Sequence, residues 1–163
     1  MDRIERVRQV VDAILLSMTD HEERRCAYLH LYGVAQACAL LSIKRKENSE
    51  LAVIAGMLHD IHSYAHMDPR DHAHKGSVMA RDILDPLELF SEEEKNLICA
   101  AIYHHSDKKN VHGPLDEILK DADVMQHVLY NPLFGIKPHE QNRFDAMKAE
   151  LGLNGNDLTL PLP

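Results

Sequence analysis

The chain has 163 residues, of which 45% are hydrophobic and 27% are charged. These values are typical of one ordinary globular domain that buries its core without disulfides. The formal net charge of −8 argues against binding to a nucleic-acid polymer, because such binding depends on Lys and Arg that neutralise phosphates. No stretch approaches the roughly 18 uninterrupted apolar residues of a membrane span, and the charges interleaved through the N-terminal segment do not resemble a signal peptide. The cysteines are three in number and form no CxxC pair, so we expect neither disulfides nor a zinc knuckle, and we expect a cytoplasmic location.

The spacing of apolar residues predicts helices along most of the chain. Asp20 with Glu23 and Ser91 with Glu94 are capping pairs that open two of them. Gly and Pro are sparse, with seven of each, and there is no repeat, no alternating β-branched run and no Gly-rich phosphate loop. We therefore expect an all-α single domain over residues 1–163, a compact bundle of about seven helices, with an irregular tail over residues 152–163. The predicted helices span residues 3–18, 20–45, 50–64, 71–84, 91–106, 114–130 and 139–151.

Histidine is unusually frequent, with 12 in the chain, and it is the commonest metal ligand in proteins. Several histidines and carboxylates stand on or at the ends of helical faces that are otherwise apolar, where a charge must be paired or must bind a metal. Such a mixed nitrogen and oxygen site suits iron, manganese, cobalt, zinc or nickel, in one or two divalent ions, better than magnesium. The residues of this kind are His30, His59, Asp60, His104, His105 and Asp123.

The order of these residues resembles the H…HD…D pattern of the HD superfamily of metal-dependent phosphohydrolases. His30 lies in YLHLYGVAQACALL, the doublet His59–Asp60 in AGMLHDIHSY and Asp123 in LKDADVMQH, and each segment is similar to the matching helix of that family. The resemblance covers roughly residues 25–130. It implies an HD-type helical bundle in which these four residues hold one metal ion, with Asp60 able to bridge to a second.

The additional histidines resemble those of the two-metal branch of the superfamily. By this analogy a second ion would be bound by His74, His104 and possibly His105, where His105 could equally contact the substrate. His72 competes with His74 for the same position. We favour His74, because it is followed by a Gly–Ser pair and an apolar helix, as in the family.

The resemblance implies hydrolysis of a phosphoester or phosphoanhydride in a small phosphorylated substrate, with a nucleotide as the expected class, by a metal-activated water. His105 or His62 would protonate the leaving oxygen, and Arg25, Lys75 and Lys108 are candidate substrate contacts. His66 follows the doublet, and we expect it either to face the pocket or to be solvated. We expect structural or surface roles for His21, His112, His127 and His139.

Two other functions remain open from the sequence. The same scaffold with two irons can oxidise small molecules with O₂, and the extra histidines are compatible with such an oxygenase. A third hypothesis is a metal-stabilised helical module that only binds a ligand. Such a module would have a closed metal site and no turnover. The oligomeric state stays open.

Overall fold

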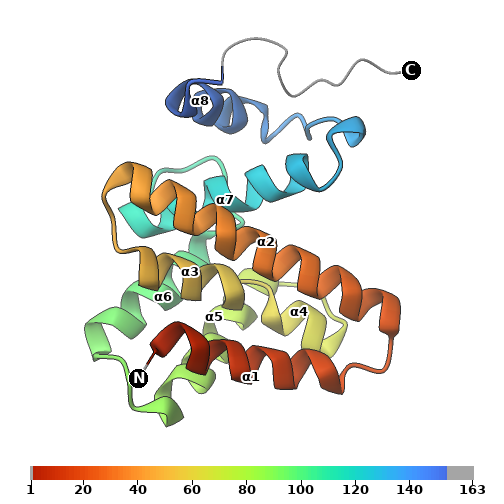
Figure 1. Ribbon diagram of the computed structural model, residues 1–163, viewed down its shortest axis with the longest axis vertical. Helices are drawn as coiled ribbons and strands as arrows, with labels where there is room; N and C mark the ends of the chain where they lie inside the picture. The colour runs from red at the N-terminus through yellow and green to blue at the C-terminus, as the bar shows by residue number, and fades with distance from the viewer. Residues whose placement is uncertain (1, 154–163) are drawn as a thin grey trace.

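The computed structural model describes residues 2–153, and these form helices joined by short loops, with no strand among them, as the sequence predicts (Figure 1). Most of the predicted tail, from residue 154 onward, lies outside the described residues. The α-helices are α1 (Arg3–Ser17), α2 (His21–Arg45), α3 (Ser49–Leu58), α4 (Ile61–His66), α5 (His72–Leu84), α6 (Glu92–His104), α7 (Pro114–Tyr130) and α8 (Gln141–Leu151), and the 3-10 helices are η1 (Asp85–Leu87) and η2 (Pro132–Phe134).

The helix boundaries follow from capping residues in the sequence. The Asp20 carboxylate accepts hydrogen bonds from the backbone N–H groups of Glu22 and Glu23 at 2.9 and 3.0 Å, and so opens α2. Ser91 and Glu94 form a complete capping box at the start of α6. Both satisfy backbone donors that the first turn of a helix leaves free. The predicted Ser91–Glu94 capping box and the capping role of Asp20 are confirmed.

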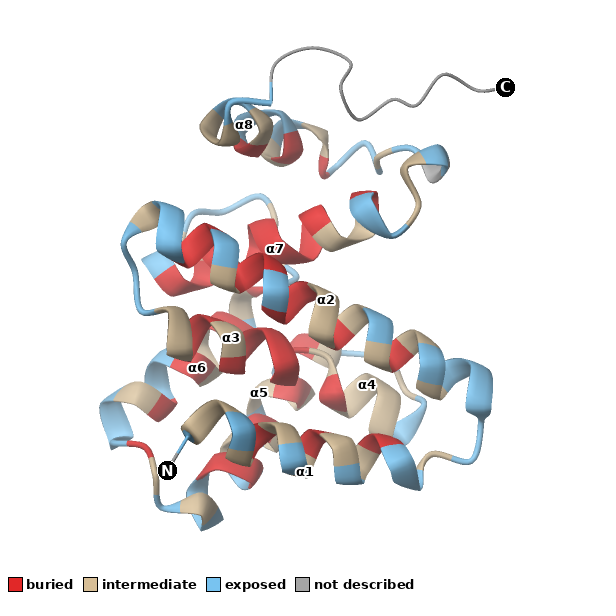
Figure 2. Ribbon diagram, viewed as in Figure 1, coloured by how far each residue is buried: buried red, intermediate tan, exposed pale blue. Residues whose placement is uncertain are grey.

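Helix α2 lies at the centre of the bundle and packs on α3 and α7, while α5 packs on α6 (Figure 1). Its length and composition are those of a helix that could cross a membrane. Leu31, Val34 and Leu41 of α2 are, however, fully buried in the core cluster, and the buried faces of the central helices point at one another (Figure 2). Core packing therefore accounts for the apolar character of α2.

The helix predicted over residues 50–64 is interrupted at the His59–Asp60 doublet. Helix α3 ends at Leu58, and Asp60, with φ −114° and ψ 13°, leads into the short helix α4. In an unbroken helix neighbouring side chains point about 100° apart. The break turns the chain at the doublet, so that both side chains reach one cluster.

Two glycines bring other helices close to the doublet. A Cβ on Gly56 would lie 2.7 Å from Cα of Ala35, so α3 and α2 are in backbone contact there. A Cβ on Gly76 would lie 2.6 Å from the carbonyl oxygen of His59, so α5 packs directly on the doublet. Since a side chain at either position would push backbone away, these glycines set the distance between the helices that carry the candidate site.

Candidate metal centre

Two histidines and two carboxylates from different helices meet at the doublet. The Nε2 atoms of His30 on α2 and His59 lie 3.0 Å apart, and Oδ2 of Asp60 is 3.5 and 3.6 Å from them. Asp123 on α7 brings its Oδ1 to 3.6 Å from His30 Nε2 and 3.9 Å from His59 Nε2. The four residues that the resemblance assigned to one ion therefore lie together in the structure.

The hydrogen bonds of the ring Nδ1 atoms determine what the Nε2 atoms offer. His59 Nδ1 donates to the carbonyl oxygen of Gly56 at 2.8 Å, and His30 Nδ1 donates to Oε1 of Gln126 at 2.9 Å. In the neutral ring the other nitrogen is then an acceptor. Two such lone pairs facing each other at 3.0 Å repel unless a cation, either a proton or a metal ion, is placed between them.

The atom separations fit a common ion. Ligand atoms about 2.1 Å from a metal are about 3 to 4 Å apart for angles between 90° and 180°. The two Nε2 atoms lie 3.0 Å from each other, and their distances to the nearest oxygens of Asp60 and Asp123 run from 3.5 to 3.9 Å. These residues can therefore hold one divalent ion with only small movements of their side chains.

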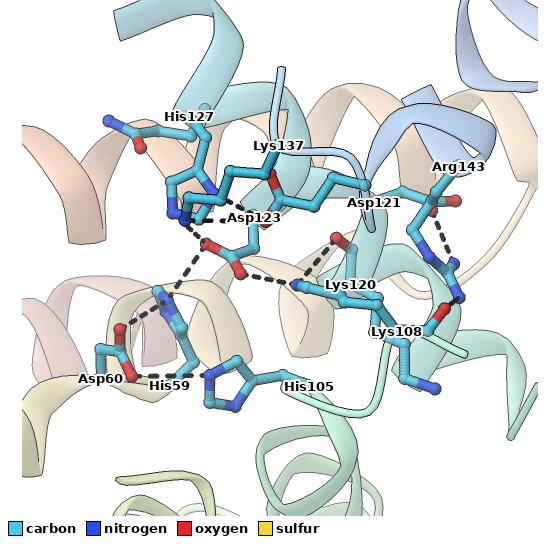
Figure 3. A network of polar contacts seen from close by, with 12 residues as sticks. His59, Asp60, His105, Lys108, Lys120, Asp121, Asp123, His127, Lys137 and Arg143 are labelled. Atoms are coloured by element: carbon cyan, nitrogen blue, oxygen red, sulfur yellow. Dashed lines mark hydrogen bonds and ion pairs between the residues drawn. The ribbon is translucent and has the colours of Figure 1, made fainter. Parts of the chain in front are cut away.

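A second group of the same kind shares Asp60. Its Oδ1 is buried and has no hydrogen-bond partner, and it lies 3.5 Å from Nε2 of His105 and 3.9 Å from Nε2 of His72. Nδ1 of His105 donates to the carbonyl oxygen of Ile102 at 2.7 Å, and Nδ1 of His72 donates to that of Pro69 at 3.2 Å. Both Nε2 atoms therefore face Asp60 as acceptors, and one carboxylate lies between two sets of potential ligands. Figure 3 shows Asp60 between His59 of one set and His105 of the other.

Burial and charge separate the two central histidines. Burial lowers the pKa of His59 to about 3. Burial also acts to lower the pKa of His30, but Asp60 and Asp123 outweigh it, so that this pKa lies above its ordinary value. The pKa of Asp60 is held well below its usual range, because its histidine neighbours outweigh the effect of burial. In the metal-free cluster the carboxylates therefore stay ionised, and His30 binds a proton more readily than His59 does.

A buried lysine completes the charge balance of the cluster. Burial would raise the pKa of Asp123, but Lys108 and the nearby histidines hold it far below its usual range. Nζ of Lys108 donates to Oδ2 of Asp123 at 2.6 Å and to the carbonyl oxygen of Lys120 at 3.2 Å (Figure 3). With Oδ2 engaged in this way, Oδ1 of Asp123 is the oxygen presented to the histidines.

Lys120 forms hydrogen bonds that stabilise the loop carrying Lys108. This side chain is fully buried, and its Nζ donates to Asn110 O at 3.0 Å, to Oε1 of Glu117 at 2.8 Å and to His112 Nδ1 at 2.6 Å. These contacts hold the segment between α6 and α7 in place, so Lys108 is part of a fixed network rather than a free surface cation.

Two histidines predicted as ligands of the second ion lie elsewhere. His74 is half-exposed, pairs with Asp71 at 2.8 Å and stacks on Tyr103. His104 Nδ1 lies 2.5 Å from Oδ1 of Asp116. Residues two apart on a helix differ by about 200° and neighbours by about 100°, so only one of each pair can face Asp60. In the structure these are His72, the alternative to His74, and His105, the neighbour of His104.

The three cations predicted as substrate contacts are all engaged by carboxylates. Arg25 is exposed and pairs with Glu22 at 2.7 Å. Lys75 pairs with Asp68 at 2.9 Å, and Lys108 is buried against Asp123. Lys108 therefore acts on a carboxylate of the cluster, and none of the three lines the cleft beside the doublet.

His62, a predicted acid, faces away from the cluster. Its ring lies 4.6 Å from that of His66, and both line a separate pocket of about 580 Å³ between α4 and α5, together with His74. Burial, and to a lesser degree His66 and Lys75, lower the pKa of His62. His105, the other predicted acid, is almost fully buried with its Nε2 toward Asp60, which is the position of a ligand.

Sequence reasoning missed His127, which it took as structural or surface. Nε2 of His127 lies 3.3 Å from Oδ1 of Asp123, and the ring stacks on that of His30 with centroids 5.6 Å apart. The spacing of Asp123 and His127 could have indicated this contact, because residues four apart on one helix share a face.

A cleft of about 400 Å³ opens beside the cluster. Within the described part of the chain its lining contains no Lys or Arg. Burial, and then the nearby Asp60, raise the pKa of Tyr64, so its hydroxyl stays a hydrogen-bond donor at neutral pH. The cleft is lined by Glu23, Asp60, Ser63, Tyr64, Met67, Pro69 and His72.

Comparison with known proteins gives one match. The family model described as HD domain matches residues 27–127, which is more than half of the chain and includes all the residues grouped around Asp60 and Asp123. Among curated proteins and solved structures, none matches significantly.

Proposed function

This chain belongs to the HD domain family, and we propose that it is a metal-dependent phosphohydrolase with a two-ion centre. Members of the superfamily are mostly metal-dependent phosphohydrolases, and its domains bind divalent metals. The observation that carries the proposal is the position of Asp60, whose two oxygens face two separate groups of histidine Nε2 atoms. A structural site would need only one closed group.

The first ion would be held by His30, His59, Asp60 and Asp123, and the second by Asp60, His72 and His105. When bound, such ions supply Lewis-acid activation of water and of a phosphate oxygen. The donor set of imidazoles and carboxylates suits iron, manganese, cobalt, zinc or nickel. Because each imidazole donates its Nδ1 proton to an oxygen, the chain presents the ligands in the correct tautomer before any ion arrives.

The substrate would enter by the cleft beside Asp60. With no Lys or Arg among the described lining residues, phosphate charge would be offset by the ions, while the hydroxyls of Tyr64 and Ser63 would donate hydrogen bonds. Met67 and Pro69 would cover an apolar part of the molecule. We propose a small phosphorylated substrate, with a nucleotide as the expected class. We also propose a cytoplasmic location, since Cys26, Cys38 and Cys99 are free thiols.

The second ion is tested with pairs of neighbouring histidines. Protein purified without chelator is analysed for metal per chain as wild type, His72→Ala and His74→Ala. We expect about two ions per chain in wild type, a fall toward one in His72→Ala and no change in His74→Ala. The same comparison of His105→Ala with His104→Ala gives an independent result. Equal metal content in all variants would contradict the second group.

The reaction is tested on the same preparations. Phosphate release from a panel of nucleotides and other small phosphoesters is measured with manganese, cobalt or iron, alongside O₂ uptake. We expect phosphate release that needs no O₂ and is lost in Asp60→Asn. O₂ consumption by the iron-loaded protein without phosphate release would refute the hydrolase and favour the oxygenase. A filled metal site with neither activity would favour the binding module.

A further inference from the structure

A third imidazole, that of His127 on α7, approaches the first metal group, which consists of His30, His59, Asp60 and Asp123. His127 lies one turn after Asp123, with its Nε2 3.3 Å from Oδ1 of that carboxylate. The ring is nearly parallel to that of His30, with an interplanar angle of 13°. Figure 3 shows His127 and His59 approaching the same oxygen of Asp123 from different sides.

The other side of the ring is held by a residue outside the family match. Nδ1 of His127 lies 3.2 Å from Oε1 of Glu140, whose side chain is only 3% exposed. Glu140 directly precedes α8, whereas the HD domain match ends at residue 127. A carboxylate at Nδ1 accepts the hydrogen bond of the ring N–H and directs the Nε2 lone pair outward, as carboxylates do behind metal-binding histidines.

Nε2 of His127 faces another acceptor atom, as the Nε2 atoms of His30 and His59 do. With Nδ1–H donated to Glu140, the Nε2 lone pair faces the Asp123 carboxylate at 3.3 Å, and two acceptors at that distance require a cation near both. The ligand atoms of His30, Asp123 and His127 all lie within 4.8 Å of one another. This spacing is close to that expected for atoms that share one ion.

We infer that His127, oriented by Glu140, is an additional ligand of the metal bound at Asp123. The segment that leads into α8 thereby takes part in metal binding, although it lies beyond the family core. This inference rests on the proposed metal centre. It predicts that metal affinity depends on a carboxylate that touches no metal.

The test is cobalt binding by chelator-stripped protein, followed by visible absorption and by competition with a chromophoric chelator. The variants are His127→Ala, His127→Gln and Glu140→Gln. The matched control is His139→Ala, because His139 also lies near Glu140, at 3.7 Å, but is more than half exposed. We expect His127→Ala and His127→Gln to weaken cobalt binding and change its absorption spectrum. We expect Glu140→Gln to weaken binding roughly 10- to 100-fold and His139→Ala to leave it unchanged.

The outcomes separate the two proposals. Wild-type affinity and an unchanged cobalt spectrum in folded His127→Gln would overturn the inference while leaving the metal centre intact. Loss of affinity in His139→Ala equal to that in Glu140→Gln would also overturn it, because the effect would then be general to the segment. Wild-type protein that binds no cobalt would refute the metal centre itself, and the inference with it.

Discussion

Replacement of Lys108 by Met gives a direct measure of the charge balance in the cluster. Nζ of Lys108 lies 2.6 Å from Oδ2 of Asp123, and both side chains are 8% exposed. Met has a similar length and fills irregular space, so the main effect of the change is to leave a buried carboxylate without its cation. Breaking a buried pair in this way costs about 3–5 kcal/mol. With a urea dependence of about 2 kcal/mol per M, the unfolding midpoint of metal-free protein should fall by about 2 M.

A bound metal should reduce this loss, because the ion would then supply positive charge at the other oxygen of Asp123. Urea unfolding is therefore measured with excess chelator and with saturating cobalt. The control is Lys75→Met, which breaks a pair with Asp68 at 2.9 Å in which the lysine is 38% exposed, and such pairs contribute about 0–1 kcal/mol. Equal stability of metal-free wild type and Lys108→Met would refute the reasoning.

Two further predictions concern the centre of the bundle. Burial keeps His59 neutral down to its pKa of about 3, against an ordinary value of 6.5. The unfolded chain therefore binds more protons than the folded chain between these values, and metal-free protein should lose up to about 1.4 kcal/mol per pH unit as pH falls through this window. His30, whose pKa is raised, contributes in the opposite sense, and its stabilisation is lost above pH 6.5. Chemical unfolding at several pH values should show a smaller slope in His59→Gln, and an equal slope would contradict the assignment. Separately, Gly56→Ala places a Cβ 2.7 Å from Cα of Ala35, and overpacking of this kind should cost about 1–3 kcal/mol. Gly33→Ala would place a Cβ against the side chain of Gln126 and not against backbone, so it should cost less, and thermal unfolding of both variants decides the point.

The helices and the first metal group could be predicted because their signals are local or lie in a fixed order. Apolar spacing and capping residues identified α2, α6 and α7 nearly to the residue. The break at the doublet was not predicted, because His59 and Asp60 follow an apolar run that is itself compatible with a continuous helix. At the break α2 approaches Gly56 closely, and Gly76 of α5 lies against the carbonyl oxygen of His59. These contacts involve residues distant in sequence.

The histidines that lie toward Oδ1 of Asp60 are His72 and His105, whereas the sequence favoured His74 and His104 for a second group. The spacing of His72 and His74 from the doublet is nearly the same, so sequence position could not separate them. The structure distinguishes them by the way α5 packs on the doublet. Gly76 of α5 lies against the carbonyl oxygen of His59, and His72 faces Asp60. His104 and His105 differ for a reason that could have been used, since His105 follows the last residue of α6.

The position of a histidine relative to its helix end explains which orientations can be predicted. His59 and His105 occupy the C-cap positions of α3 and α6, and each donates Nδ1–H to the carbonyl oxygen three residues earlier. Carbonyls of a last helical turn have free accepting capacity, and this local bond directs Nε2 away from the helix. The carbonyl of Ile102 also accepts the backbone N–H of His105 at 3.3 Å. A histidine at the C-terminal end of an apolar helix is thus oriented by local structure for the ligand role proposed for His59 and His105.

His30 and His127 lie inside their helices, where nearby carbonyls already accept backbone hydrogen bonds. Their Nδ1 atoms therefore need side-chain oxygens from elsewhere, and these are provided by Gln126 and Glu140. Gln126 directly precedes His127, so α7 supplies Asp123, the residue that orients His30 and an imidazole of its own within two turns. The orientation of these interior histidines depends on contacts between helices. If they bind metal as proposed, metal affinity should depend on the docking of α7 against α2 and of the α8 segment against α7.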